Sequence, residues 1–166
     1  MLKTVFSRLS THHVLLGMAW ACVLSVIAAL VGQYQFDMRP CAWCVLQRAI
    51  YLLIALLCVI AAYLPPRAPR MVLTSGALVL AALGAAAAVY QHVVAAKLYS
   101  CNLTLADTII SALRLEALLP ALFQITGSCA DAAVSVLGVP FEYWSLLLFI
   151  LLALAALSVL IRPHAG

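Results

Sequence analysis

The sequence predicts an all-α membrane protein, a bundle of four transmembrane helices. Hydrophobic residues make up 67% of the 166 residues and charged residues only 8%, whereas soluble domains carry about 25% charged residues. The apolar residues form four long uninterrupted runs instead of a helical stripe, which is typical of helices that cross a bilayer. Lipid cannot hydrogen-bond the backbone, so such runs must satisfy their amides internally as helices.

We expect a single membrane domain over the whole chain, 1–166. Its four spans are predicted at about residues 14–32, 45–64, 72–96 and 142–161. The first run follows a basic start, as a signal peptide does, but it is longer than a signal core and no small-x-small cleavage site ends it. We therefore expect it to be retained as a span.

The placement of charges predicts the orientation of the bundle. The two termini and the loop after the second span hold five basic residues and no acid: Lys3, Arg8, Arg67, Arg70 and Arg162. The other side, formed by loops 33–44 and 97–141 and the start of the last span, carries all five acids. Positive residues favour the cytoplasm, so both termini are expected there and both loops face outward. No basic patch with interleaved aromatic residues points to a nucleic-acid partner.

The six cysteines fall into two groups. Cys22 and Cys58 lie within spans and are interpreted as small apolar packing residues. The other four lie in or at the edge of the outward loops: Cys41, Cys44, Cys101 and Cys129. Disulfides persist outside the cytoplasm. Four cysteines permit three pairings, and the sequence does not choose among them.

Three interpretations of the loop cysteines compete: two structural disulfides, a zinc site and a relay of reactive disulfides. The close pair Cys41–Cys44 fits half of a zinc ribbon, but Cys101 and Cys129 do not supply a second close pair. A disulfide with two intervening residues exchanges readily because one of its sulfurs is stabilised as a thiolate. Cys44 falls where the second span begins, and a helix N-terminus favours a thiolate. These features favour the relay.

Arg48 follows Cys44 by four residues, so both lie on one helix face. An arginine inside an apolar span is costly and usually functional; the simpler alternative is a side chain that snorkels to the surface. Repeated disulfide formation needs an electron acceptor, which in a membrane can be a lipid-soluble quinone. The sequence has no nucleotide fingerprint, haem motif or ferredoxin-type cysteine run that would supply another. Arg48 would then stabilise both the thiolate and the acceptor.

Taken together, these motifs resemble the disulfide bond formation protein B (DsbB) family of the bacterial inner membrane. The resemblance spans nearly the whole chain. It rests on the order and spacing of Pro40-Cys41-x-x-Cys44 with Gln47-Arg48, Tyr90-Gln91-His92, Cys101, residues 115–123, Gly127-Ser128-Cys129-Ala130-Asp131, and Leu137-Gly138 before Trp144. It implies ubiquinone or menaquinone as cofactor, no metal, and a soluble periplasmic thioredoxin-like oxidase of the DsbA type as partner.

The resemblance also implies a sequence of thiol exchanges. The partner's thiolate attacks a Cys101–Cys129 disulfide and forms a mixed disulfide with Cys101. Cys129 then attacks Cys41, and Cys44 leaves as a thiolate that passes electrons to the quinone with the help of Arg48. His92 corresponds to the family's histidine near the quinone; the alternative is an interfacial histidine without a ligand.

The sequence departs from the family pattern in its outward loop. Leu119 stands where the family commonly has a tryptophan before the proline equivalent to Pro120, and the family's proline-x-tryptophan is spread out here as Pro140 and Trp144. Partner choice is therefore open, and a paralogous oxidase with a dedicated substrate is one alternative function. A non-enzymatic scaffold with two structural disulfides is another. Two further alternatives fit the sequence less well. A conduit that carries electrons outward would need reactive cysteines facing the cytoplasm, where no CxxC is expected. A relative of vitamin K epoxide reductase would carry its CxxC late in the chain, whereas Cys41 and Cys44 lie early.

One segment of the long loop, 109–125, has apolar residues interleaved with charged ones. It is predicted to lie flat on the outer leaflet as an amphipathic segment. Pro120 makes it a broken helix at best. Such a segment would keep the loop cysteines close to the membrane.

Overall fold

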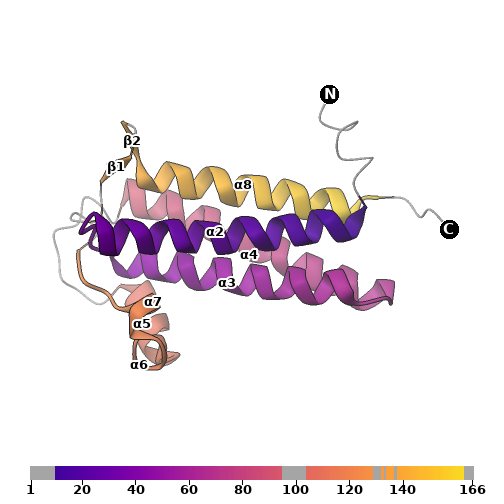
Figure 1. Ribbon diagram of the computed structural model, residues 1–166, viewed down its shortest axis with the longest axis horizontal. Coiled ribbons are helices and arrows are strands. Elements are labelled where there is room, and N and C mark those ends of the chain that lie inside the picture. The colour runs from indigo at the N-terminus through magenta and orange to yellow at the C-terminus, as the bar shows by residue number, and fades with distance from the viewer. Residues whose placement is uncertain (1–9, 95–103, 129–131, 133, 137, 163–166) are drawn as a thin grey trace.

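A computed structural model of the protein describes residues 10–94, 104–128, 132, 134–136 and 138–162. Four long helices lie side by side in a bundle (Figure 1). They are α2 (Thr11–Gln35), α3 (Ala42–Tyr63), α4 (Arg67–Val93) and α8 (Phe141–Leu160). Each is long and apolar enough to cross a membrane. The predicted fold class, an all-α bundle of four membrane helices, is confirmed.

All four long helices begin one to five residues earlier than the apolar runs predicted, and the difference matters most for α3 and α4. α3 begins at Ala42 with Cys41 as its N-cap residue, so Cys44 lies in its first turn and not in a loop. α4 begins at Arg67, which together with Arg70 was expected in the connecting loop. Arginine has a high helix propensity and its long side chain reaches water from a helix end, so a polar residue does not mark the end of a membrane helix.

α2 packs on α3, α3 on α4, and α4 on α8. A smaller contact between α2 and α8 closes the bundle. Cys22 and Cys58 are fully buried in the apolar core of this bundle, as small packing residues are expected to be. Close packing of α4 on α8 depends on Gly84, where a Cβ atom would overlap the ring of Phe149. That ring stacks on Tyr51 of α3, with centroids 4.2 Å apart.

Three short helices lie at the side of the bundle, next to the start of α3 (Figure 1): α5 (Leu105–Ala112), α6 (Leu115–Leu118) and α7 (Pro120–Phe123). Thr104 and Asp107 form a capping box that starts α5. Ile110 of α5 is fully buried in a second apolar cluster that contains Cys41. Pro120 is the first residue of α7, so it breaks the 109–125 segment as predicted.

A two-stranded antiparallel hairpin precedes α8, formed by β1 (Ser135–Val136) and β2 (Val139–Pro140). Gly138 in its turn has a φ of 79°, a conformation that favours glycine. The start of α2 and the end of α8 lie at one end of the bundle, and this hairpin lies at the other (Figure 1). Which end faces the cytoplasm stays a prediction.

Candidate functional site: a dithiol beside an apolar cavity

The first turn of α3 brings Cys41 and Cys44 together. Their Sγ atoms lie 3.1 Å apart, a hydrogen-bonding distance that is well beyond the roughly 2.05 Å of a disulfide bond. Cys41 is almost completely buried in the cluster that α5 covers. Cys44 is half-buried and lines a cavity between the helices. The two sulfurs therefore have different surroundings, and only that of Cys44 faces the cavity.

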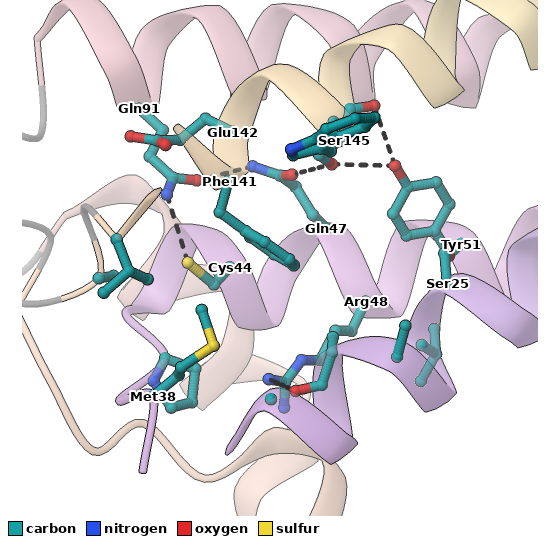
Figure 2. A pocket seen from close by; sticks show the side chains of 18 of the residues that line it. Ser25, Met38, Cys44, Gln47, Arg48, Tyr51, Gln91, Phe141, Glu142 and Ser145 are labelled. Atoms are coloured by element: carbon teal, nitrogen blue, oxygen red, sulfur yellow. Dashed lines mark hydrogen bonds between the residues drawn. The ribbon is translucent and has the colours of Figure 1, made fainter. Parts of the chain in front are cut away.

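The cavity has a volume of about 210 Å³. Figure 2 shows Cys44, Gln47 and Arg48 of α3 around it, with side chains of α4 and α8. Most of its wall is apolar and includes Ala29, Met38, Pro40, Phe141 and Leu148. A dry cavity of about 150 Å³ accommodates benzene, so this one has room for a substituted six-membered ring.

Arg48 is buried at the cavity wall, with only 6% of its surface exposed. Its Nη1 donates hydrogen bonds to Gln33 Oε1 (2.7 Å) and to the Leu122 carbonyl oxygen (3.1 Å), and its Nη2 approaches the Ala29 carbonyl oxygen at 3.5 Å. Within the described part of the chain these partners are all neutral, and no carboxylate forms an ion pair with it. The side chain is therefore turned inward, and its positive charge lies beside the cavity.

A row of hydrogen bonds leads from the interior of the bundle to Cys44 (Figure 2). Tyr51 Oη lies 2.9 Å from Ser145 Oγ, which in turn donates to Gln47 Oε1. Gln47 Nε2 donates to Gln91 Oε1 (2.8 Å), and Gln91 Nε2 donates to Cys44 Sγ (3.3 Å). The sequence motifs contained both glutamines but did not predict this row. The available signal was the four-residue spacing of Gln47 and Tyr51, which places both on one face of α3.

His92 does not line the cavity. Its Nδ1 lies 3.7 Å from Glu142 Oε1, and its Nε2 lies 3.2 Å from the hydroxyl of Tyr143. Glu142 lines the cavity, is 3% exposed, and its Oε2 has no hydrogen-bond partner among the described residues. In Figure 2 its carboxylate lies beside Gln91. Sequence reasoning missed Glu142, which carries no motif and comes from the first turn of α8.

Cys101 and Cys129 lie outside the described residues. The described segment before Cys129 packs against the residues that precede Cys41: the backbone amides of Thr126 and Gly127 donate to the Pro40 carbonyl oxygen at 3.1 and 3.2 Å. A Cβ atom at Gly127 would lie 2.7 Å from the Cβ of Arg39, so glycine permits this close approach. Among the described residues no three His, Cys, Asp or Glu side chains gather as metal ligands would.

The fold and the site define a multi-pass membrane protein with a dithiol at the edge of an apolar cavity between its helices. The family model "Disulfide bond formation protein DsbB" matches residues 11–159. Disulfide bond formation protein B 1 of Pseudomonas syringae pv. syringae is 37% identical over 152 residues, which cover 90% of this chain and 88% of that protein. Disulfide bond formation protein B of Herminiimonas arsenicoxydans is 30% identical over 156 residues, covering 94% and 99%. The chain belongs to the DsbB family.

Family membership confirms the resemblance drawn from the motifs. It identifies the chain as a membrane protein of disulfide bond formation and points to a disulfide-forming oxidoreductase. Cys44, Arg48 and the glutamine of the Tyr90-Gln91-His92 motif all line this cavity, so residues of two separate sequence motifs meet at one small volume.

Proposed function

We propose that the protein is a protein-disulfide:quinone oxidoreductase of the bacterial inner membrane. It reoxidises a periplasmic thioredoxin-like dithiol oxidase of the DsbA type and passes the electrons to a membrane quinone. One observation carries the proposal: the sulfur of Cys44 and the guanidinium of Arg48, which has no carboxylate partner among the described residues, line the same apolar cavity. A dithiol that is reoxidised repeatedly needs a two-electron acceptor, and this cavity places a cation where negative charge would develop.

The cavity suits a quinone ring in size and in the chemistry of its wall. A bound quinone, either ubiquinone or menaquinone, supplies a two-electron acceptor that becomes a quinol. Met38 and Phe141 offer apolar surface for the ring, and the guanidinium of Arg48 offers hydrogen-bond donors for a carbonyl oxygen. Cys44 is the sulfur that meets the acceptor, since Cys41 is enclosed under α5.

The loop cysteines connect this pair to the outside. Cys101 receives the partner's thiolate, and Cys129 then attacks Cys41, so that each step breaks one disulfide and forms another. Packing of Thr126 and Gly127 on Pro40 supports this order, because it anchors the chain two residues before Cys129 beside the residue that precedes Cys41.

His92 acts on the cavity through Glu142. The contact between His92 and Glu142 joins a half-exposed imidazole to a buried carboxylate at the cavity wall. The His92–Glu142 pair links water at the bundle surface to the cavity. His92 therefore has a role in the site without touching the quinone ring.

The proposal is tested by following quinone absorbance with the purified protein in detergent, ubiquinone and a reduced periplasmic thioredoxin-like dithiol. Wild type is expected to reduce the quinone, Cys44→Ser and Cys101→Ser to be inactive, and Cys22→Ser, a buried cysteine of the bundle core, to serve as the active control. Activity that survives in Cys101→Ser would refute the order of exchange. No reduction of ubiquinone or menaquinone with several dithiols would refute the oxidoreductase and favour a scaffold with structural disulfides.

A further inference from the structure

The hydrogen bonds that end on Cys44 all run in one direction. The hydroxyl of Ser145 and the amides of Gln47 and Gln91 each accept on one side and donate on the other, and the last donor, Gln91 Nε2, points at Cys44 Sγ. Both glutamines are at most 5% exposed. In this arrangement Cys44 receives an N–H donor, which suits a thiolate because a thiolate only accepts.

The same row can also run in the opposite direction. A primary amide carries a donor and an acceptor at nearly equal distances, so a half-turn of both glutamine amides exchanges the two. Gln47 then donates to Ser145 Oγ, Gln91 donates to Gln47, and the carbonyl oxygen of Gln91 faces Cys44 Sγ. That oxygen accepts a hydrogen bond from a thiol S–H.

Tyr51, at the end of the row opposite Cys44, can pair with Ser145 in both directions. Its hydroxyl oxygen lies 2.9 Å from Ser145 Oγ and 3.1 Å from the Ser145 carbonyl oxygen. In the first direction it donates to Oγ. In the second it accepts from the Ser145 hydroxyl and donates to the carbonyl oxygen. No polar group of the row is left unpaired in either state, which matters because an unpaired buried group is costly.

We propose that Tyr51, Ser145, Gln47 and Gln91 form a hydrogen-bond relay that reverses when the Cys44 sulfur gains or loses its proton and so stabilises both states. The relay deepens the proposed function and rests on it for its purpose, because a cysteine that alternates between disulfide, thiolate and thiol needs a partner for each form. No proton travels along the row; the proton of Cys44 leaves to water or to a base in the cavity, and only the orientations of the four groups change.

The test measures the rate at which iodoacetamide alkylates Cys44, since only the thiolate reacts. The protein carries Cys41→Ser, contains no quinone and is held at one mildly acidic pH, with unfolded protein as the reference for intrinsic reactivity. The other charged or titratable side chains that line the cavity, Arg39, Arg48 and Glu142, are the same in every variant. Peptide mass spectrometry assigns the modification to Cys44.

Two variants are expected to change the rate in opposite directions. Gln91→Leu removes the donor to a charged sulfur, so alkylation falls roughly tenfold. Tyr51→Phe leaves that donor in place. In the first state it removes only a donor to Ser145 Oγ, which still donates to Gln47; in the reversed state it leaves the Ser145 hydroxyl without its acceptor, the larger loss, so alkylation is expected to rise by about threefold. A fixed donor without reversal predicts no rise in Tyr51→Phe.

An unchanged or lower rate in Tyr51→Phe overturns the relay, and so does an unchanged rate in Gln91→Leu. Gln91→Met, an unbranched side chain of similar length, replaces Gln91→Leu if circular dichroism shows that the latter is misfolded. Because no quinone is present, the alkylation rates are independent of quinone turnover. A wild-type protein that fails to reduce quinone would therefore refute the proposed function without deciding the relay.

Discussion

At the scale of single residues, Arg48 is the side chain whose position is hardest to explain by stability. A buried cation among neutral oxygens contributes little to folding, because its desolvation offsets the hydrogen bonds it forms. Its position beside Cys44 is explained if negative charge develops in the cavity.

Replacing Arg48 with methionine is therefore expected to lower the rate of quinone reduction by roughly a hundredfold, the loss typical of one electrostatic stabiliser. The thermal midpoint in detergent is expected to stay the same or to rise. Arg70→Met is the matched control, since Arg70 donates to the Leu64 carbonyl oxygen outside the cavity. A destabilised Arg48→Met protein with normal turnover would show that Arg48 is structural.

The sequence predicted part of this site through local spacing. Cys41, Cys44 and Arg48 lie within one stretch of α3, so the helical repeat alone places them together. Ser145 and Glu142 come from α8, almost a hundred residues later. Their proximity depends on how the helices pack, and no local pattern reports that.

At the scale of elements, the contact between α4 and α8 sets the geometry of the site, because it aligns Gln91 with Ser145 through Gln47. Gly84 permits this contact. The apolar runs predicted that four helices exist, but not where they begin, since polar and charged residues near the starts of α3 and α4 interrupt the runs, such as Gln47 and Arg67. The two-residue strands of the hairpin are too short for an alternating pattern.

Gly84→Ala is expected to destabilise the bundle by about 1–3 kcal/mol, because its Cβ overlaps the Phe149 ring and forces the core to adjust. Gly17→Ala is the matched control: no atom lies within 4 Å of its Cβ position, and alanine favours a helix. Unfolding in detergent mixtures compares the two. Equal stability of both variants would mean that α4 and α8 are not packed this closely.

Thr104→Ala removes one half of the capping box of α5, a change that costs about 0.5–2 kcal/mol of helix stability. Because α5 covers Cys41, its loosening is expected to increase the alkylation of Cys41 severalfold while that of Cys44 changes little. Thr108→Ala, on the next exposed turn of the same helix, is the control. Unchanged Cys41 reactivity would show that α5 does not shield this sulfur.

At the scale of the whole molecule, the site is useful only if the end of the bundle that carries Cys41 faces outward. The α2–α3 connection, the short helices α5–α7 and the hairpin before α8 lie at that end (Figure 1). The distribution of positive charge predicts which side of the membrane this end faces. The first and third connections lie on the same side because two membrane helices separate them.

Orientation is tested with a membrane-impermeant maleimide on intact spheroplasts. Phe36→Cys, on a residue 74% exposed at the end of the bundle that carries Cys41, is expected to react. Ala68→Cys, exposed in the first turn of α4, is expected to react only after the membrane is opened. Labelling in the reverse pattern would place the dithiol on the cytoplasmic side and remove access to a periplasmic partner.

Electron transfer from the dithiol to a quinone is tested most simply by a single turnover at the cavity. A protein with Cys101→Ser and Cys129→Ser is reduced, freed of reductant and mixed with ubiquinone, and quinol is counted against protein. We expect one quinol per protein and a Cys41–Cys44 disulfide, and neither product in the same protein carrying Cys44→Ser. Absence of quinol from the reduced dithiol would contradict electron transfer from this site to a quinone.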